Sequence, residues 1–463
     1  MGKLYHSTTL SRRGRRAQKD LEEELLGTPK IAINKDYTVV GRNKLRIAKK
    51  EEQHIACETV TTYTTADGLT FQYWARQRTL IPPWQLHWYQ LRDMMRLKLA
   101  NGLLEHLLKK LSSIAPGNTV WKKARWISKR LREIGIKWNF ISIAERLQAL
   151  EGRGKRERKL DTIEIRHLRG VLTLLKTPYH TLTGRIAEAG GVKNPKFPIN
   201  LKNRWGARLL GAALGDGSLV RTKIGRQEYI HFKYSNKDPQ LLEEFKKAIK
   251  KVFGDANISE TIDPRSETHN LQVTSTLVGE ALAAIGAPVG DKVKQNPPSP
   301  PILHLLTRKE KAELIAQLFS DDASPHPEKV RYSQSIDITD LLTQEEIKTI
   351  AQHVKPHKVR KEEKQHYRLP IGELEELARK GRIDKSVIYK IRSYRPRIMG
   401  TIREILDREF GVKCEYSPEV LVLSVDKSQV KASWRLRIYK ESINDFKAKI
   451  GFISKLKERR MEE

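Results

Sequence analysis

The sequence predicts an α+β fold in which one pattern of elements occurs twice. A short apolar helix that ends on a carboxylate is predicted at residues 209–217 and again at residues 314–323, with Asp216 and Asp322 as the terminal acids. The acids are 106 residues apart (322 − 216), which is a domain-sized spacing. After each acid, hydrophobic alternation predicts a strand, and a lysine and a second helix follow. In order, these elements are a strand at 229–234, Lys237, a helix at 240–253, a strand at 434–439, Lys440 and a helix at 443–450.

Small residues are spaced four apart in both apolar helices. Gly211 and Gly215 share one face of the first helix, and Ala316 and Ser320 share one face of the second, because residues four apart are neighbours on a helix. Small side chains let two helix backbones approach closely. We therefore expect these two helices to cross and to bring their terminal acids side by side.

Two carboxylates in that position need a partner. Each would lie near a helix C-terminus, where the macrodipole disfavours negative charge. Two like charges close together also raise each other's pKa. A hard divalent cation relieves both effects, and carboxylate oxygens with water are ligands that Mg²⁺ accepts. The pattern predicts a metal-dependent phosphodiester site at Asp216 and Asp322.

The two apolar stretches resemble the paired LAGLIDADG motifs of single-chain homing endonucleases. Aligned on that motif, Asp216 and Asp322 fall on the metal-binding acid. The second copy departs from the pattern, with Gln317 where the first has Gly211 and with Ala323 where the family has glycine. The resemblance covers residues 200–460. It extends to three shorter stretches that resemble links and closing segments of the family, at 286–292, 424–426 and 450–452.

The resemblance implies two α/β repeats that are related by a pseudo-twofold axis and form a saddle-shaped antiparallel sheet. It also implies a site-specific endonuclease that hydrolyses double-stranded DNA with Mg²⁺, each half serving one strand. Lys237 and Lys440 match the lysines that the family places near the site, so the resemblance implies that they stabilise charge on the phosphate or polarise the attacking water. No second copy of the chain is needed, so a monomer is expected.

The saddle would lie over the DNA major groove, where base edges carry a readable code. The strands expected to face the groove are Gln227–Tyr234, Leu271–Thr274, Val330–Ser335, Lys358–Arg368 and Arg435–Tyr439. The basic residues expected to contact phosphate are Lys233, Arg331, Arg435 and Arg437. Phosphate contacts position a protein on DNA without specifying sequence.

Charge and cysteine content narrow the partners and the compartment. The 463-residue chain has 88 Lys and Arg against 55 Asp and Glu, a formal net charge of +33, which predicts a polyanionic partner. Cys57 and Cys414 have no paired spacing, which argues against a zinc site and a disulfide framework and predicts an intracellular, reducing location. This location is cytoplasmic in a prokaryote, and the basic, acid-free stretch 1–19 keeps an organelle open. No apolar run has transmembrane length, so no membrane partner is expected.

Residues 1–150 are predicted to form a mixed, mainly helical region that is basic and rich in tryptophan. Helices are expected at 17–26 and over 85–110, and strands over Thr59–Trp74 with a turn at Asp67-Gly68. Six of the eight tryptophans lie between Trp74 and Trp138. Two interpretations stay open, a small tryptophan core with charges facing water and a nucleic-acid-binding surface. The basic residues of the second interpretation are Lys122, Lys123, Arg125, Lys129, Arg130 and Arg132.

Residues 151–199 are predicted to be a linker followed by two short helices, at 163–175 and 181–189. Two helices beside the basic cluster 153–159 are compatible with a helix-turn-helix. The first repeat is then expected at 200–305 and the second at 306–463.

Two alternatives use the same fold. One is an RNA-binding splicing cofactor, or maturase, with intron RNA as the partner, and the other is a DNA-binding regulator that does not cleave. An intein is disfavoured, because the chain begins with Met1 and ends in a charged helix without a terminal Asn.

Overall fold

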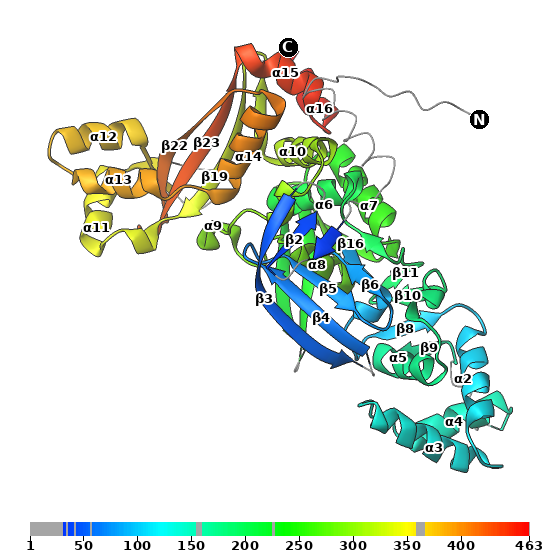
Figure 1. The fold of residues 1–463 in the computed structure, drawn as a ribbon. Helices are drawn as coiled ribbons and strands as arrows, with labels where there is room; N and C mark the ends of the chain where they lie inside the picture. The colour runs from blue at the N-terminus through cyan, green and yellow to red at the C-terminus, as the bar shows by residue number, and fades with distance from the viewer. Residues whose placement is uncertain are drawn as a thin grey trace.

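The computed structural model describes residues 31–33, 36–40, 43–55, 58–153, 160–224, 227–357 and 366–462. It is a mixed helix and strand structure with curled antiparallel sheets (Figure 1). The predicted helix at 17–26, the basic stretch 1–19, Cys57, most of the basic cluster 153–159 and most of the predicted strand Lys358–Arg368 lie outside the described residues.

The first sheet is an antiparallel meander in the order β1-β2-β3-β4-β5-β6. Its strands are β1 Ile31–Ile33, β2 Tyr37–Val40, β3 Asn43–Ile55, β4 Glu58–Thr65, β5 Thr70–Trp74 and β6 Thr79–Ile81. The strands predicted over Thr59–Trp74 are confirmed, and Gly68 takes a left-handed φ of 88° in the turn between them. The expectation of a mainly helical N-terminal region is wrong for residues 31–99, because alternating β-branched and aromatic residues form strands there.

A five-stranded sheet follows, in the order β15-β11-β10-β8-β9. The helix expected over 85–110 begins only at Leu103, because Leu97 and Leu99 are buried while Arg96 and Lys98 are exposed, and this alternation makes β8 a strand. The elements from here to the first acid-bearing helix are β7 Gln85–Leu86, η1 Trp88–Gln90, β8 Arg96–Leu99, α2 Leu103–Ile114, α3 Val120–Glu133, α4 Phe140–Leu150, β9 Thr162–Glu164, α5 Ile165–Leu174, η2 Tyr179–Leu182, β10 Ile186–Ala189, β11 Val192–Lys193 and β12 Ile199–Asn200.

The predicted helix-turn-helix is wrong, because its second helix does not form. The first predicted helix is α5, but the stretch 181–189 contains the strand β10, which pairs with β8 and β11. Strand β11 pairs in turn with β15 of the following half, so backbone hydrogen bonds join this segment to the rest of the chain. The domain limits at 150, 199 and 305 stay predictions.

Most tryptophans of the N-terminal region are core residues. Trp74, Trp84 and Trp88 are fully buried, and Trp138 is nearly so, which confirms the core interpretation for these four. The ring of Trp121 on α3 is 44% exposed and lies outside this core.

The first of the two halves that carry an acidic helix starts with α6 and contains a four-stranded sheet in the order β13-β14-β17-β16. Its elements are α6 Arg204–Leu214, β13 Gly217–Ile224, β14 Gln227–Asn236, α7 Pro239–Val252, β15 Asp255–Ala256, β16 Ile258–Asp263, β17 Thr268–Val273, α8 Thr276–Ala284, α9 Lys292–Gln295 and η3 Pro301–His304. The predicted strand and helix after the first acid are confirmed as β14 and α7.

The second of these halves starts with α10 and contains a six-stranded sheet in the order β18-β19-β23-β22-β21-β20. Its elements are α10 Arg308–Asp322, β18 Ala323–His326, β19 Lys329–Asp337, η4 Thr339–Leu341, α11 Gln344–His353, β20 Lys355–His357, β21 His366–Pro370, α12 Ile371–Arg379, α13 Lys385–Ser393, α14 Arg397–Ile405, the π-helical turn η5 Leu406–Phe410, β22 Cys414–Leu423, β23 Val430–Tyr439, α15 Lys440–Lys449 and α16 Lys455–Arg459. The predicted strand at 434–439 and helix at 443–450 correspond to β23 and α15.

Among the described residues, every helix is too short or too polar to cross a membrane.

Candidate active site

The helices α6 and α10 cross in contact, as their small residues predict. A Cβ placed on Gly211 would lie 2.5 Å from the carbonyl oxygen of Leu314, and one on Gly215 would lie 2.6 Å from Oδ2 of Asp321. Atoms cannot approach that closely, so the crossing requires glycine at both positions. Close packing through small residues is the basis of such contacts.

The contact face of the second helix differs from the expected one. Gln317 and Asp321 face α6, whereas Ala316 packs with Leu241 and Ile453, and Ser320 accepts the backbone N–H of Ile453 at 2.7 Å. Helix α7 and the C-terminal segment cover the Ala316 face. The expectation that Ala316 and Ser320 form the crossing is therefore wrong, although they do share a face.

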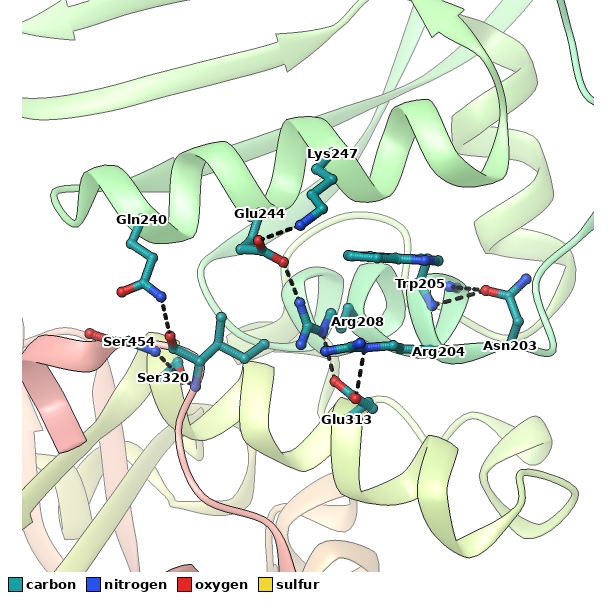
Figure 2. A network of polar contacts seen from close by, with 12 residues as sticks. Asn203, Arg204, Trp205, Arg208, Gln240, Glu244, Lys247, Glu313, Ser320 and Ser454 are labelled. Atoms are coloured by element: carbon teal, nitrogen blue, oxygen red, sulfur yellow. Dashed lines mark hydrogen bonds and ion pairs between the residues drawn. The ribbon is translucent and has the colours of Figure 1, made fainter. Parts of the chain in front are cut away.

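The opposite end of the helix pair is held by ion pairs (Figure 2). Arg208 on α6 reaches Glu313 on α10 at 2.7 Å and also contacts Glu244 on α7. Asn203 accepts the backbone N–H of Trp205 at 2.9 Å and so caps the start of α6. These contacts join α6, α7 and α10 and fix the angle at which the acid-bearing ends meet.

Asp216 follows the C-terminal end of α6, and Asp321 and Asp322 end α10. Asn236 at the end of β14 donates to Asp216 Oδ2 at 2.8 Å and to the Tyr234 hydroxyl at 3.4 Å. The same hydroxyl donates to Asp321 Oδ1 at 2.7 Å. A chain of hydrogen bonds therefore connects the acidic ends of the two helices.

Asp321 is the inner acid of the pair on α10. Gln317 also donates to its Oδ1 at 2.9 Å, whereas Oδ2 is buried and has no hydrogen-bond partner among the described residues. Burial raises the pKa of Asp321 well above its usual range, and the nearby Asp216 carboxylate raises it further. Asp321 was not among the acids predicted from the sequence, although it stands directly before Asp322.

Asp322 is the outer acid and its side chain is accessible to solvent. Protein atoms nevertheless surround it on most sides and limit its hydration. This desolvation, followed by the charge of Asp216, raises the pKa of Asp322 to about 7. Desolvation likewise raises the pKa of Asp216, against the opposing effect of Lys457 and Lys292. The two acids predicted from the sequence thus lie within electrostatic reach of each other.

A pair of lysines occupies equivalent places at the two helix ends. Lys292 on α9 donates through Nζ to the last carbonyls of α6 and the next turn, those of Ala213, Leu214, Gly215 and Gly217, at 2.5–3.1 Å. Lys457 on α16 donates to the carbonyls at the end of α10, those of Phe319, Asp321 and Ala323, at 2.7–3.4 Å. A cation at a helix C-terminus offsets the macrodipole.

These lysines also offset the carboxylates. Burial lowers the pKa of both Lys292 and Lys457, and the three acids oppose that shift. Both lysines were missed from the sequence. A signal was present for Lys292, which ends the 286–292 link, whereas Lys457 lies five residues beyond the closing segment 450–452.

We expect Lys292→Met to destabilise the protein by about 1–3 kcal/mol, because it leaves the carbonyls at the end of α6 without their donor. Urea unfolding monitored by circular dichroism measures this change. Lys294→Met is the matched control, since Lys294 lies two residues away on the same short helix and is exposed. Equal stability of the two variants would contradict the capping role.

The raised pKa of Asp322 predicts a pH-dependent stability in the presence of a chelator. The folded protein holds this proton up to about pH 7, whereas the unfolded chain releases it near about 4, so stability falls as the pH rises between these values. Asp322→Asn should therefore have a higher melting temperature than the unaltered protein at pH 8, and the difference should shrink towards pH 4. A difference that is constant with pH would refute this assignment.

Lys237 and Lys440 lie on the segments that follow β14 and β23. Lys237 is exposed, and Lys440 is 73% exposed and pairs with Glu328 at 3.2 Å. Neither is among the charges that shift the pKa values of the three acids most. Their predicted catalytic roles stay predictions.

The second-half sheet presents a row of arginines. Along β23, even-numbered residues are buried and odd-numbered residues are partly exposed, which places Arg435 and Arg437 on the outer face. Arg331 on β19 lies directly opposite Arg437. Like charges directly opposite each other are destabilising, and a polyanion on this face would relieve the repulsion. Glu419 and Glu415 of β22 each pair with one of these arginines, Glu415 at 3.9 Å.

The first-half sheet is less basic. Lys233 on β14 is exposed and lies opposite Gln272 on β17 and Ser218 on β13. Its outer face offers mainly polar side chains that can donate and accept hydrogen bonds.

The predicted basic residues of the N-terminal region lie on α3. Lys122, Arg125, Lys129 and Arg130 are exposed, and Lys123 is partly buried. The Arg125 guanidinium lies over the Phe140 ring, and Arg130 pairs with Glu133 at 2.8 Å. Helix α3 lies far from α6 and α10 in Figure 1.

The donor set at the helix crossing suits a hard cation. Among the described residues, no group of three or more His, Cys, Asp and Glu side chains is arranged to hold a metal. Mg²⁺ does not require such a group, because it is commonly bound by one or two carboxylates with water and substrate phosphates. Asp216 and Asp322 could supply those carboxylates, and the unpartnered Oδ2 of Asp321 fits a nearby positive charge.

Comparison with protein-family models finds no match for this chain, and comparison with curated protein sequences finds none. Comparison with solved structures finds similarity to homing endonucleases. One is I-DmoI in complex with DNA and Mn, at 12% identity and a TM-score of 0.31, with 54% of this chain and 98% of that chain covered. Another is I-WcaI bound to its DNA recognition sequence, at 12% identity and a TM-score of 0.26, covering 56% and 85%.

A third similar structure is the LAGLIDADG meganuclease I-AabMI bound to uncleaved DNA, at 12% identity and a TM-score of 0.24, with 56% of this chain and 88% of that chain covered. Identities this low transfer no residue's role.

Proposed function

We propose that this protein is a site-specific endonuclease that hydrolyses double-stranded DNA with a divalent cation, Mg²⁺ in the cell. The observation that carries the proposal is the meeting of Asp216 and Asp322 at the ends of two crossed helices, each end capped by a partly buried lysine. Such a pair of acids is costly for a merely structural contact, because burial and mutual repulsion both disfavour their charged forms.

The sheets support a DNA-binding saddle. In both halves the acid-bearing helix is followed by a hairpin that forms one edge of the sheet. This hairpin is β13-β14 in the first half, where β17 lies next to it, and β18-β19 in the second half, where β23 lies next to it. This recurrence is what a pseudo-twofold axis along the helix crossing would produce. An alternating strand face that is polar on one side and buried on the other can place side chains in the major groove.

The chain's own residues would prepare the phosphate for hydrolysis. Asp216 and Asp322 would hold the cation, which when bound lowers the pKa of water and neutralises charge on the phosphate. Asn236 orients Asp216, and the Tyr234 hydroxyl and Gln317 orient Asp321. Lys292 and Lys457 act as positioning residues, since their ammonium groups are engaged by backbone carbonyls. Arg331, Arg435 and Arg437 would hold the DNA backbone. Because both halves belong to one chain, we propose that a monomer suffices.

A second function, RNA binding as a splicing cofactor, is favoured by one observation. Trp121 on α3 is exposed beside Lys122 and Arg125, and exposed aromatics among cations suit stacking of unpaired bases. This interpretation concerns the N-terminal region and can coexist with DNA cleavage.

The test is a cleavage assay on DNA selected by the protein from a random duplex library. We expect linear products with Mg²⁺, no products with a chelator, and binding in both conditions. DNA binding without cleavage in Mg²⁺ or Mn²⁺ would identify a non-cleaving regulator. Preference for a structured RNA over every selected duplex would favour the splicing cofactor.

A further inference from the structure

A basic cleft lies in the N-terminal region, between α3 and α4 on one side and β8, β9 and α5 on the other. Its volume is about 1080 Å³. Among the described residues, five cationic side chains line it against one carboxylate, that of Glu164; the five are Arg96, Arg132, Lys137, Arg146 and Arg166. Of the five, Arg132 belongs to the basic residues of α3 that the sequence pattern assigned to nucleic acid, and the other four come from outside α3. Figure 1 places α3 and α4 at the opposite end of the molecule from α11, α12 and α13.

The floor of the cleft is rigid. The Trp138 ring stacks on His167 with ring centroids 4.4 Å apart, and His167 Nε2 lies 3.2 Å from the carbonyl oxygen of Lys137. Ser128 donates to the Trp138 carbonyl at 2.7 Å. Arg146 crosses this floor, with its guanidinium over the Trp138 ring and an N–H donated to the Thr162 carbonyl at 3.1 Å. These contacts hold the cationic walls at a fixed separation.

The cations of the cleft are mostly uncompensated. Glu164 pairs with Arg166 at 2.8 Å, and among the described residues of the lining it is the one acid. The side chains of Arg96, Arg132 and Lys137 are exposed and have no ion pair or hydrogen bond within the part of the chain that the structure describes. The start of α4 at Phe140 also opens into the cleft, and a helix N-terminus favours an anion.

We propose that this cleft binds the phosphodiester backbone of a nucleic acid, as a second contact region separate from Asp216 and Asp322. Several uncompensated cations around one concavity suit a chain of phosphates better than a single small anion, because each phosphate can meet its own cation. Trp138 is buried, with His167 stacked on its ring and the Arg146 guanidinium over it, so its ring is not open to a base and the cleft contacts the backbone. Binding here is independent of cleavage and extends the length of strand that the protein covers.

The test compares two triple variants of the full chain that lose the same charge. The cleft variant is Arg96→Gln, Arg132→Gln and Lys137→Gln. The control variant is Lys110→Gln, Lys176→Gln and Arg185→Gln, whose side chains are exposed, belong to the same region and lie outside the cleft. Both leave the acid site unchanged, and matching thermal melts show that both fold.

Affinity is measured by fluorescence anisotropy from low to high salt, with a random-sequence duplex, oligo-dT and oligo-U as probes. We expect the cleft variant to reduce the slope of log K against log salt by about 2–3 for duplex and by about 2 for single strands, and the control variant to change it by less than about 1. The probe with the largest loss identifies the natural strand. A charge-preserving triple, Arg96→Lys, Arg132→Lys and Lys137→Arg, should retain the full slope.

Equal slopes for the cleft and control variants with all three probes would overturn the proposal. The outcome is separable from that of the proposed function, because it is measured without Mg²⁺ and without cleavage. A protein that fails to cut DNA but shows the cleft-specific loss would keep this site and lose the nuclease assignment.

Discussion

Asp216→Asn and Asp322→Asn are each expected to lower the rate of DNA cleavage by at least about 10³-fold, a loss of about 4 kcal/mol of transition-state stabilisation. Each substitution keeps the shape of the side chain and removes one of the two carboxylates that would hold the cation. DNA affinity should be kept or slightly increased, because a negative charge near the phosphates is lost. Single-turnover cleavage and anisotropy on the same duplex measure the two effects.

Asp340→Asn is the matched control for these variants. Asp340 is an exposed acid in η4 of the second half, and no hydrogen bond or ion pair of its side chain occurs among the described residues. We expect unchanged cleavage. Retained cleavage by either Asp216→Asn or Asp322→Asn would reject the metal-holding roles. Loss of both cleavage and folding would instead mean that the acids are needed to offset the charges of Lys292 and Lys457.

Gly211→Ala is expected to destabilise the protein by about 1–3 kcal/mol, because the new methyl group would lie 2.5 Å from the Leu314 carbonyl oxygen and 3.0 Å from Gln317 Cβ. The helices must separate to accept it, which would also pull Asp216 away from Asp322. Equilibrium unfolding in guanidinium measures the first effect, and the cleavage rate measures the second.

Gly400→Ala in the middle of α14 is the matched control. A Cβ at Gly400 meets no atom within 4 Å, so the substitution should stabilise the protein by about 0.5–1 kcal/mol through helix propensity alone. If Gly211→Ala were as harmless as Gly400→Ala, the tight crossing of α6 and α10 would not exist in solution.

The apolar helices and the strand and helix after each acid could be predicted, because hydrophobic period and small-residue spacing are local properties. The rotation of α10 about its own axis, which decides which side chains face α6, could not be predicted. Ala316 and Ser320 are smaller than Gln317 and Asp321, yet α7 and the C-terminal segment bury that small face, and this choice depends on parts of the chain far away in sequence. Gln317 itself lies at the crossing, against Gly211 of α6.

The N-terminal region was harder to predict. A strand such as β8 alternates buried and exposed residues over only four positions, which an apolar helix pattern can imitate in a short window. Strand β10 was mistaken for a helix for the same reason, since its partners β8 and β11 are not visible in local sequence. The cleft could not be predicted as a whole, because Arg96, Arg132 and Arg166 come from three separate elements and only Arg132 belongs to the basic cluster on α3.

The central claim is that one cation cluster is shared by the acids of two crossed helices. Anomalous diffraction from crystals of the protein grown with Mn²⁺ and bound to a selected duplex tests it most directly. We predict a manganese peak about 2 Å from carboxylate oxygens of both Asp216 and Asp322. A peak coordinated by neither acid, or carboxylates turned apart with no peak between them, would contradict the claim.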